Sequence, residues 1–280
     1  MGCYIDTTIV CAVADDLPNL ASTSKQHIDA NQPGAIPYYA LRELVAGPLK
    51  TLCAAHSLLA RSESIADAFR CVMNLPPIVG RTKQGQLSAL IQTLGQCLTL
   101  TPTDLAAAPR QPIDDPVRRK MTHNLAINIQ RQWSLAKRIP NTKTSHQLAC
   151  FADGDFDFNE TGELKGPNGR FQCDPSQPCS AAAHLRGKLG EVQTLVDVLH
   201  PSKLTPELAD KRENVRRRGA LKEVIRLQKG ERTSFPKKDC RALGDAYFAV
   251  MCPPGSHVLT TNFVDHDLLC TALGKTAIKP

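Results

Sequence analysis

The chain has 280 residues, of which 42% are hydrophobic, and a formal net charge of +7. This length allows one large domain or a core that carries an insertion. No apolar run approaches the ~20 residues that a transmembrane helix requires, which excludes an integral membrane protein. The first residues lack the basic and apolar stretches of a signal peptide. We therefore expect the 11 cysteines to be reduced thiols in a cytoplasmic protein.

The N-terminal segment contains two candidate metal ligands. Asp6 ends a short apolar run, and a strand that ends in an acid presents its carboxylate at the edge of a sheet. Thr7 follows directly and is expected to help fix the geometry of that carboxylate. Glu43 lies in a segment, residues 39–44, that we expect to be helical. Asp6 and Glu43 are expected to share one divalent-metal site.

The middle of the chain is predicted to be mostly helical. Residues 54–75 contain no Gly or Pro and end at Pro76. Apolar residues trace one face of a helix over residues 87–98, and prolines punctuate residues 102–116, which indicates a linker. Apolar residues recur at helical spacing in two further segments, residues 117–133 and 185–199.

One group of Cys and His residues in this region could coordinate zinc. Its spacing is looser than that of the usual zinc knuckle, so isolated thiols are the alternative. The group consists of Cys150, Cys173, Cys179 and His184.

A strongly basic segment precedes the C-terminal part of the chain. Residues 211–241 contain twelve Lys and Arg against four acids, a net charge of +8. Such a cluster attracts polyanions and can supply the salt-dependent phosphate contacts of nucleic-acid binding. A solvated basic helix is the alternative, but in a chain with a divalent-metal site we favour nucleic-acid binding. The residues expected to contact nucleic acid are Arg216, Arg217, Arg218, Lys222 and Arg226.

The C-terminal segment supplies two more acids. Asp245 lies in a predicted helix, and a buried strand over residues 258–261 leads into Asn262 and Asp265. Asn262 is expected to orient the Asp265 carboxylate.

Three neighbours of these acids leave the assignment open. One residue of slippage in the loop would exchange Asp265 with Asp267, and an earlier helix start would exchange Asp245 with Asp239. His266 is interpreted as a surface histidine or as a support for the site.

Both ends of the chain resemble the PIN-domain nuclease family. Tyr4-Ile5-Asp6-Thr7-Thr8-Ile9 is similar to the first strand with its first acid, and Tyr39-Ala40-Leu41-Arg42-Glu43-Leu44 to the helix with the second. Gly244-Asp245-Ala246-Tyr247-Phe248-Ala249 resembles the third-acid helix, and Asn262-Phe263-Val264-Asp265 the last acidic motif. The resemblance covers residues 1 to about 75 and about 235 to 280. It fails at His266, where an aromatic usually stands, and in the long separation of the second and third acids.

The resemblance implies an α/β fold with a central, mainly parallel sheet flanked by helices and a large, mostly helical insertion. We expect residues 1–100 to form the N-terminal part of a PIN-like core and residues 235–280 its C-terminal part. Residues 101–234 would form the insertion, with the basic segment at its C-terminal end. Strands at Cys3–Asp6 and residues 258–261 should lie in one sheet.

The resemblance also implies a function, which is hydrolysis of phosphodiester bonds with Mg²⁺ or Mn²⁺. RNA is favoured over DNA, in a toxin-like or defence-associated role. Asp6, Asp245 and Asp265 would ligate the metal directly, and Glu43 would ligate it through water or orient the attacking water. Without metal, the four carboxylates are expected to repel one another and destabilise the site.

Two alternatives belong to other classes of protein. One is a catalytically degenerate PIN-like protein that binds nucleic acid or recruits a partner. The other is a zinc-stabilised helical interaction protein unrelated to nucleases. A protein partner or inhibitor could bind the helical insertion, and a homo-oligomer is compatible with the sequence.

Overall fold

The computed structural model describes residues 1–17, 19–74, 88, 91–95, 116–151, 154–158, 164–165, 178–209 and 211–280. The chain divides into two compact units. The first comprises Met1–Arg42, Arg138–Ala152 and Cys173–Pro280, and the second comprises Glu43–Lys137 and Asp153–Gln172.

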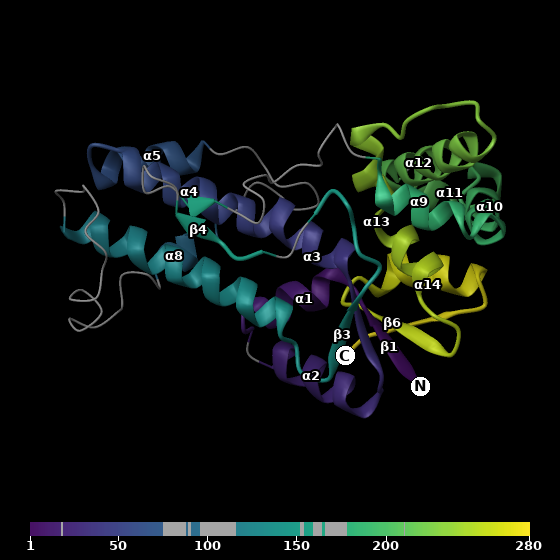
Figure 1. Ribbon diagram of the computed structural model, residues 1–280, viewed down its shortest axis with the longest axis horizontal. Helices are drawn as coiled ribbons and strands as arrows, with labels where there is room; N and C mark the ends of the chain where they lie inside the picture. Colours follow the sequence, from purple (N-terminus) through teal and green to yellow (C-terminus); the bar gives the residue numbers. More distant parts are fainter. Residues whose placement is uncertain are drawn as a thin grey trace. The chain divides into compact units, whose positions relative to one another are not determined.

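The first unit is built on a five-stranded sheet with the order β3-β2-β1-β6-β7 (Figure 1). All neighbouring strands are parallel. β1 pairs with β6 so that Cys3 lies opposite His257, which confirms that the N-terminal and C-terminal strands share one parallel sheet. The strands are β1 (Gly2–Ile5), β2 (Gly34–Pro37), β3 (Thr142–Ser145), β6 (Ser256–Leu259) and β7 (Thr276–Ile278).

Helices cover both faces of this sheet. Tyr4 of β1 contacts Phe248 of α13 (Lys237–Met251), whereas His257 of β6 contacts His27 of α2 (Leu20–Ala30). These strand residues point to opposite faces, because His257 is in register with Cys3 and successive side chains alternate. The other helices of this unit are α1 (Thr7–Ala14), α9 (Ser180–Arg186), α10 (Leu189–Val198), η3 (Pro201–Lys203), α11 (Pro206–Ala209), α12 (Arg212–Gln228) and α14 (Phe263–Ala272), with most of α3 (Tyr38–Leu44).

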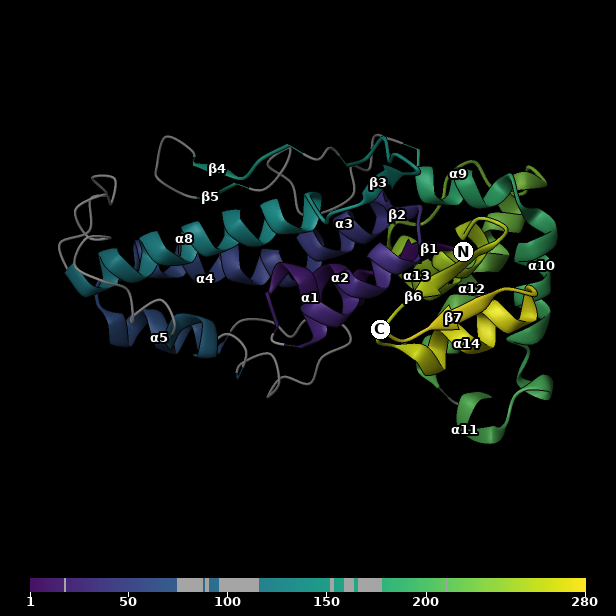
Figure 2. The ribbon, with the colours of Figure 1, turned by 90° about the horizontal axis from the view of Figure 1, so that it is seen from below.

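The second unit consists of helices and a short hairpin. The π-helix η1 (Val45–Leu49) leads into α4 (Lys50–Arg61), and α5 (Ile65–Met73) follows. The long helix α8 (Pro116–Lys137) lies alongside α4 (Figure 2). Leu125, Ile129 and Trp133 from its predicted apolar face are buried. β4 (Asp157–Phe158) and β5 (Leu164–Lys165) form the antiparallel hairpin.

The structure divides the chain differently from the sequence-based prediction. The segment 101–234 is not one insertion, because β3 and the helices α9 to α12 belong to the first unit. Residues 43–74, which were expected in the core with the sheet, belong to the second unit. β3 has the sequence Thr-Lys-Thr-Ser, without an apolar residue. This polar sequence is tolerated because β3 is an edge strand whose side chains are partly or fully exposed.

Two predicted helices are each split in two. Residues 54–75 break after Arg61, and the Ser64 hydroxyl accepts a hydrogen bond from the Asp67 backbone N–H, which caps the new helix α5. Residues 185–199 break at Gly187 and Lys188, between α9 and α10. The predicted segments 87–98, apart from residues 88 and 91–95, and 102–115 lie outside the described residues. Within the described part of the chain, no helix combines the length and apolar character that a membrane span requires.

Candidate metal centre

The candidate site lies beyond the carboxyl ends of β1 and β6. The strand order reverses between these neighbours, because β2 and β3 follow on one side of β1 and β6 and β7 lie on the other. In an open parallel sheet, ligands bind at such a switch point. Asp6 directly follows β1 and Thr260 directly follows β6, so both side chains come from this position.

Asp6 is buried and held by a set of hydrogen bonds. It is the N-cap of α1, and its Oδ1 accepts a bond of 2.6 Å from the Thr7 backbone N–H. Its Oδ2 accepts bonds from the hydroxyls of Thr8, at 2.7 Å, and Thr260, at 2.8 Å. Because both hydroxyls donate to the same oxygen, the carboxylate has a fixed orientation and is kept as an acceptor.

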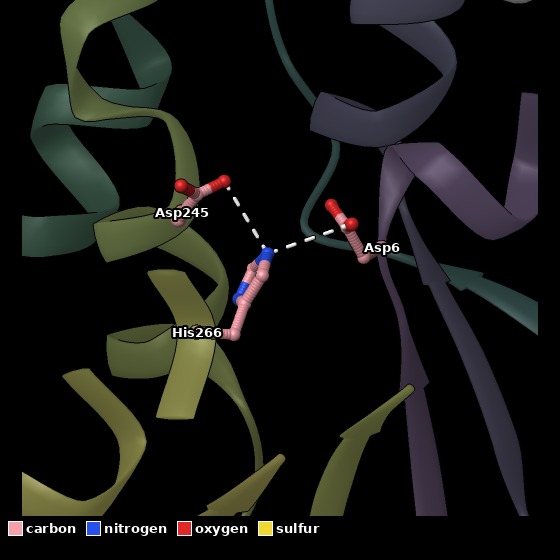
Figure 3. A group of neighbouring side chains, drawn as sticks. All are labelled: Asp6, Asp245 and His266. Carbon is pink, nitrogen blue, oxygen red and sulfur yellow. Dashed lines mark ion pairs between the residues drawn. The ribbon is translucent and has the colours of Figure 1, made fainter. Parts of the chain in front are cut away.

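Asp245 reaches the site because α13 is kinked at the residue before it. Gly244 has φ 36° and ψ −125°, a conformation that favours glycine. The kink is supported by Tyr39, whose hydroxyl donates to the Cys240 carbonyl at 2.7 Å and accepts from the Gly244 N–H at 3.2 Å. The second half of α13 thereby begins with Asp245 directed toward Asp6 (Figure 3).

His266 of α14 lies between the two carboxylates (Figure 3). Its Nε2 is 3.3 Å from Oδ1 of Asp245 and 3.5 Å from Oδ2 of Asp6. The side chain has 0% exposure. These contacts lack the geometry of hydrogen bonds, and within the described residues neither ring nitrogen has a hydrogen-bond partner. The expectation of a surface histidine was wrong.

The electrostatics of these three residues favour a positive charge between the carboxylates. Burial acts to lower the pKa of His266, but the charge of Asp6 and the close contacts with the Asp245 and Asp6 carboxylates outweigh it and raise the pKa to about 12. Burial acts to raise the pKa of Asp6, yet His266 and the threonine hydrogen bonds bring it below its ordinary value. The pKa of Asp245 is lowered against the same burial effect by His266 and by the charge of Arg217. Both carboxylates are therefore ionised at neutral pH.

Two cations of α12, its N-cap Lys211 and the inner residue Arg217, pair with Asp265 and Asp245. Arg217 is buried, donates to Oδ2 of Asp245 and also donates to Oδ1 of Asn214 at 2.9 Å. Lys211 pairs with Oδ1 of Asp265. Each of these cations offsets the expected repulsion among the carboxylates, although the charge of Asp6 still acts to raise the pKa of Asp245.

The donor atoms of Asp6, Asp245 and His266 could hold a metal ion. One donor atom from each lies within 4.8 Å of the other two. Carboxylate oxygens suit Mg²⁺ and Mn²⁺, whereas an imidazole nitrogen suits transition metals. The two carboxylates thus fit the expected Mg²⁺ or Mn²⁺, and the histidine fits Mn²⁺ better than Mg²⁺.

The structure brings together some of the predicted site residues and not others. Asp6 and Asp245 converge, whereas Asp265 lies outside the group that could bind metal and instead accepts a hydrogen bond of 3.0 Å from the Asn262 side chain. Asn262 therefore orients Asp265 as predicted. Glu43 is half-buried and belongs to the second unit, so its part in the site stays a prediction.

The alternatives for the C-terminal acids are not favoured. Asp267 is exposed, and Asp239 lies in the first turn of α13, before the kink that directs Asp245. The sequence interpretation missed the hydroxyls of Thr8 and Thr260, which hold Asp6 together with the backbone N–H of Thr7. The adjacent threonine pairs at residues 7–8 and 260–261 were the available signal.

The predicted nucleic-acid contacts divide into exposed and inward-facing residues. Arg216 and Lys222 are exposed, and Arg226 is exposed but pairs with Glu223 at 2.7 Å. Arg218 is half-buried and its Nε donates to the Val196 carbonyl at 3.2 Å. Arg217 was expected to contact nucleic acid, but the structure shows it buried, with its guanidinium paired with Asp245. Among these five residues, the exposed charges on α12 are therefore Arg216, Lys222 and Arg226, the last of them paired with Glu223.

The predicted zinc group is not assembled among its described members. Nδ1 of His184 is 2.8 Å from the Tyr247 hydroxyl, and Cys150 and Cys179 are half-buried and form no disulfide. These three residues do not form a metal-binding group by the distances of their donor atoms. Cys173 lies outside the described residues.

The fold and the site define an α/β protein with a parallel sheet and an acidic cluster at its switch point. No protein-family model, curated protein or solved structure matches the chain.

Proposed function

We propose that this chain is a metal-dependent, PIN-like nuclease that hydrolyses phosphodiester bonds. The observation that carries the proposal is the convergence of Asp6 and Asp245 with His266 beyond the carboxyl ends of β1 and β6. The preference for RNA over DNA, and a toxin-like or defence-associated role, rest on the resemblance of both chain ends to that family. The proposed location is the cytoplasm, where cysteines are kept reduced.

In this proposal the chain itself supplies fixed charges and an ordered place for substrate. Asp6 and Asp245 would hold Mg²⁺ or Mn²⁺, which when bound neutralises phosphoryl oxygens and lowers the pKa of a water molecule. Thr8 and Thr260 keep the Asp6 carboxylate in one orientation. The kink at Gly244 and the guanidinium of Arg217 do the same for Asp245. Such fixed carboxylates need little rearrangement during the reaction.

A specific observation favours a second function, a catalytically degenerate protein that binds nucleic acid. Arg217 and Lys211 already neutralise Asp245 and Asp265. A site whose carboxylates are all compensated by protein cations has less need of a metal ion. The exposed Arg216 and Lys222 would still attract phosphates.

An activity measurement separates the two functions. Wild-type protein is expected to cleave single-stranded or structured RNA with Mg²⁺ or Mn²⁺. Asp6→Asn and Asp245→Asn should each lower the rate at least about a hundredfold, since metal assistance contributes several kcal/mol to the barrier. Asp267→Asn is the matched control, because Asp267 is an exposed acid one residue after His266 and should not affect cleavage.

RNA binding gives the second readout, measured in the Asp6→Asn background so that cleavage does not interfere. Arg216→Gln and Lys222→Gln should each reduce the slope of log affinity against log salt by about 0.7. Binding with this salt dependence but no wild-type cleavage on any RNA or DNA substrate would favour the degenerate protein. Absence of both cleavage and binding would refute both functions.

A further inference from the structure

His266 belongs to the converging group, but the nuclease proposal assigns it no role of its own. It has 0% exposure, and neither ring nitrogen has a hydrogen-bond partner in the described part of the chain. Its Nε2 is instead ion-paired with the carboxylates of Asp245, at 3.3 Å, and Asp6, at 3.5 Å, so it occupies a position where a cation is favoured. A metal ion bound by Nε2 would displace the proton of this nitrogen to solvent and take over its charge. The Nε2 atom is directed at the two carboxylates that would hold the metal (Figure 3).

We propose that His266 is the third ligand of this metal site and that its nitrogen makes the site select Mn²⁺ over Mg²⁺. The inference rests on the proposed function, because it concerns the same metal ion. It goes beyond that function by assigning the ion and the ligand atom, Nε2 of His266.

The geometry of the three side chains suits one ion. Neighbouring ligands of an octahedral ion with bonds of about 2.1 Å lie about 3 Å apart. Nε2 of His266 is 3.3 Å from an oxygen of Asp245 and 3.5 Å from an oxygen of Asp6, so a small closure would bring all three to ligand positions. The second oxygen of Asp245 remains with Arg217, which leaves Oδ1 for the ion.

The imidazole ring is also held in the required direction. The ring of Phe248 packs against it at 5.8 Å between centroids with an interplanar angle of 70°. His266 lies on α14, which packs against α13, the helix of Phe248 and Asp245. The ring therefore presents Nε2 without a change of backbone position.

The chemistry of the three ligands determines which divalent ion the site prefers. Mg²⁺ prefers oxygen ligands, and an imidazole suits later divalent metals, whose affinity for nitrogen rises along the series that begins at Mn²⁺. Two carboxylates keep the site acceptable to Mn²⁺. Replacing the imidazole by an oxygen donor should therefore remove the advantage of Mn²⁺ over Mg²⁺.

The test measures binding and coordination in the full chain, with no substrate present. Titration with MnCl₂ gives the affinity from the loss of the free-ion signal in electron paramagnetic resonance, and competition with MgCl₂ gives the preference. We expect wild-type protein to bind Mn²⁺ at least about tenfold more tightly than Mg²⁺. Pulsed spectra of the Mn²⁺ complex, at less than one ion per chain, should show modulation from a directly bound ¹⁴N nucleus.

Substitutions show which residue supplies the nitrogen bound to the ion. His266→Asn should retain Mn²⁺ but lose the ¹⁴N modulation and most of the preference over Mg²⁺, while Asp6→Asn should lose Mn²⁺ at this site. His257→Asn is the control, because it removes another buried imidazole of the same unit. His257 points to the opposite face of the sheet from Tyr4 and is not part of the acidic site. If His266→Asn does not fold, the wild-type spectrum alone decides.

The outcomes distinguish the inference from the function on which it rests. Mn²⁺ bound without ¹⁴N modulation, or with an affinity equal to that for Mg²⁺, would overturn the role of His266 and leave a Mg²⁺-dependent nuclease intact. Failure of Asp6→Asn to reduce the binding would place the ion elsewhere and overturn the inference. RNA cleavage is scored separately, in the experiment described above.

Discussion

Single residues differ in how much of their role can be read from the sequence. Asp6 was predictable, because it ends an apolar run and a strand end directs its side chain to the sheet edge. Its partner Thr260 was not, since it lies 254 positions away and only the pairing of β1 with β6 brings it near. For His266 the sequence left a surface position and a supporting role at the site open, and only the structure shows that it is buried. Its burial arises from the packing of α14 on α13.

A pair of histidines, the half-buried His27 and the buried His257, gives a prediction at this scale. Nε2 of His27 and Nε2 of His257 are 2.9 Å apart, which requires one ring to donate and the other to accept. Burial, and then the neighbouring His27, lower the pKa of His257 to about 4, and burial lowers the pKa of His27. The unfolded chain, with histidine pKa values near 6.5, takes up protons first as the pH falls.

We therefore expect the free energy of unfolding to decrease as the pH falls from about 6.5 toward about 4, by up to about 1.4 kcal/mol per pH unit for each histidine. Urea unfolding at several pH values measures this change. His257→Gln should be less stable than wild type at pH 7 but should lose less stability over that range. An identical pH profile in the variant would show that this pair does not govern the response.

At the scale of elements, α12 shows what a charge count leaves out. Arg217 was expected to contact nucleic acid with its basic neighbours, although it shares the buried face of the helix with Asn214, Leu221 and Val224. The spacing of three, four and three residues along this face is a helical period, so the inward direction of Arg217 was available from the sequence. Its partner was not, because Asp245 comes from another helix after a glycine kink.

Arg217 should consequently matter for stability rather than for surface charge. Arg217→Gln leaves the Asp245 carboxylate without its cation, and removing one partner of a buried ion pair costs about 3 kcal/mol. Arg216→Gln, one residue earlier and exposed, should change the free energy of unfolding by no more than about 0.5 kcal/mol. Urea unfolding of both variants makes the comparison. Equal, small effects would mean that the Arg217–Asp245 pair does not stabilise the fold.

At the scale of the whole molecule, the sequence predicted the α/β class and the parallel pairing of both chain ends, but not the composition of the units. The apolar strands β1 and β6 have strong local signals, whereas the polar edge strand β3 has none. The chain also passes between the two units several times, so contiguous boundaries could not describe it. Both candidate carboxylates and His266 fall within the first unit.

The division into two units predicts which helices and strands a bound metal ion stabilises against opening. A ligand raises the opening free energy of the structure that binds it, by about 2.7 kcal/mol at a hundred times its Kd. Mn²⁺ should therefore slow amide hydrogen exchange in β1, α13 and α14, by up to about a hundredfold where exchange requires opening of the site. Exchange in α4 and α8 of the second unit should stay unchanged. Hydrogen exchange read by mass spectrometry tests this, with Asp245→Asn as the control in which no element should respond. Equal slowing in α4 and α8 would show either that the two units open together or that the ion binds elsewhere. If the slowing persists in Asp245→Asn, the ion binds elsewhere.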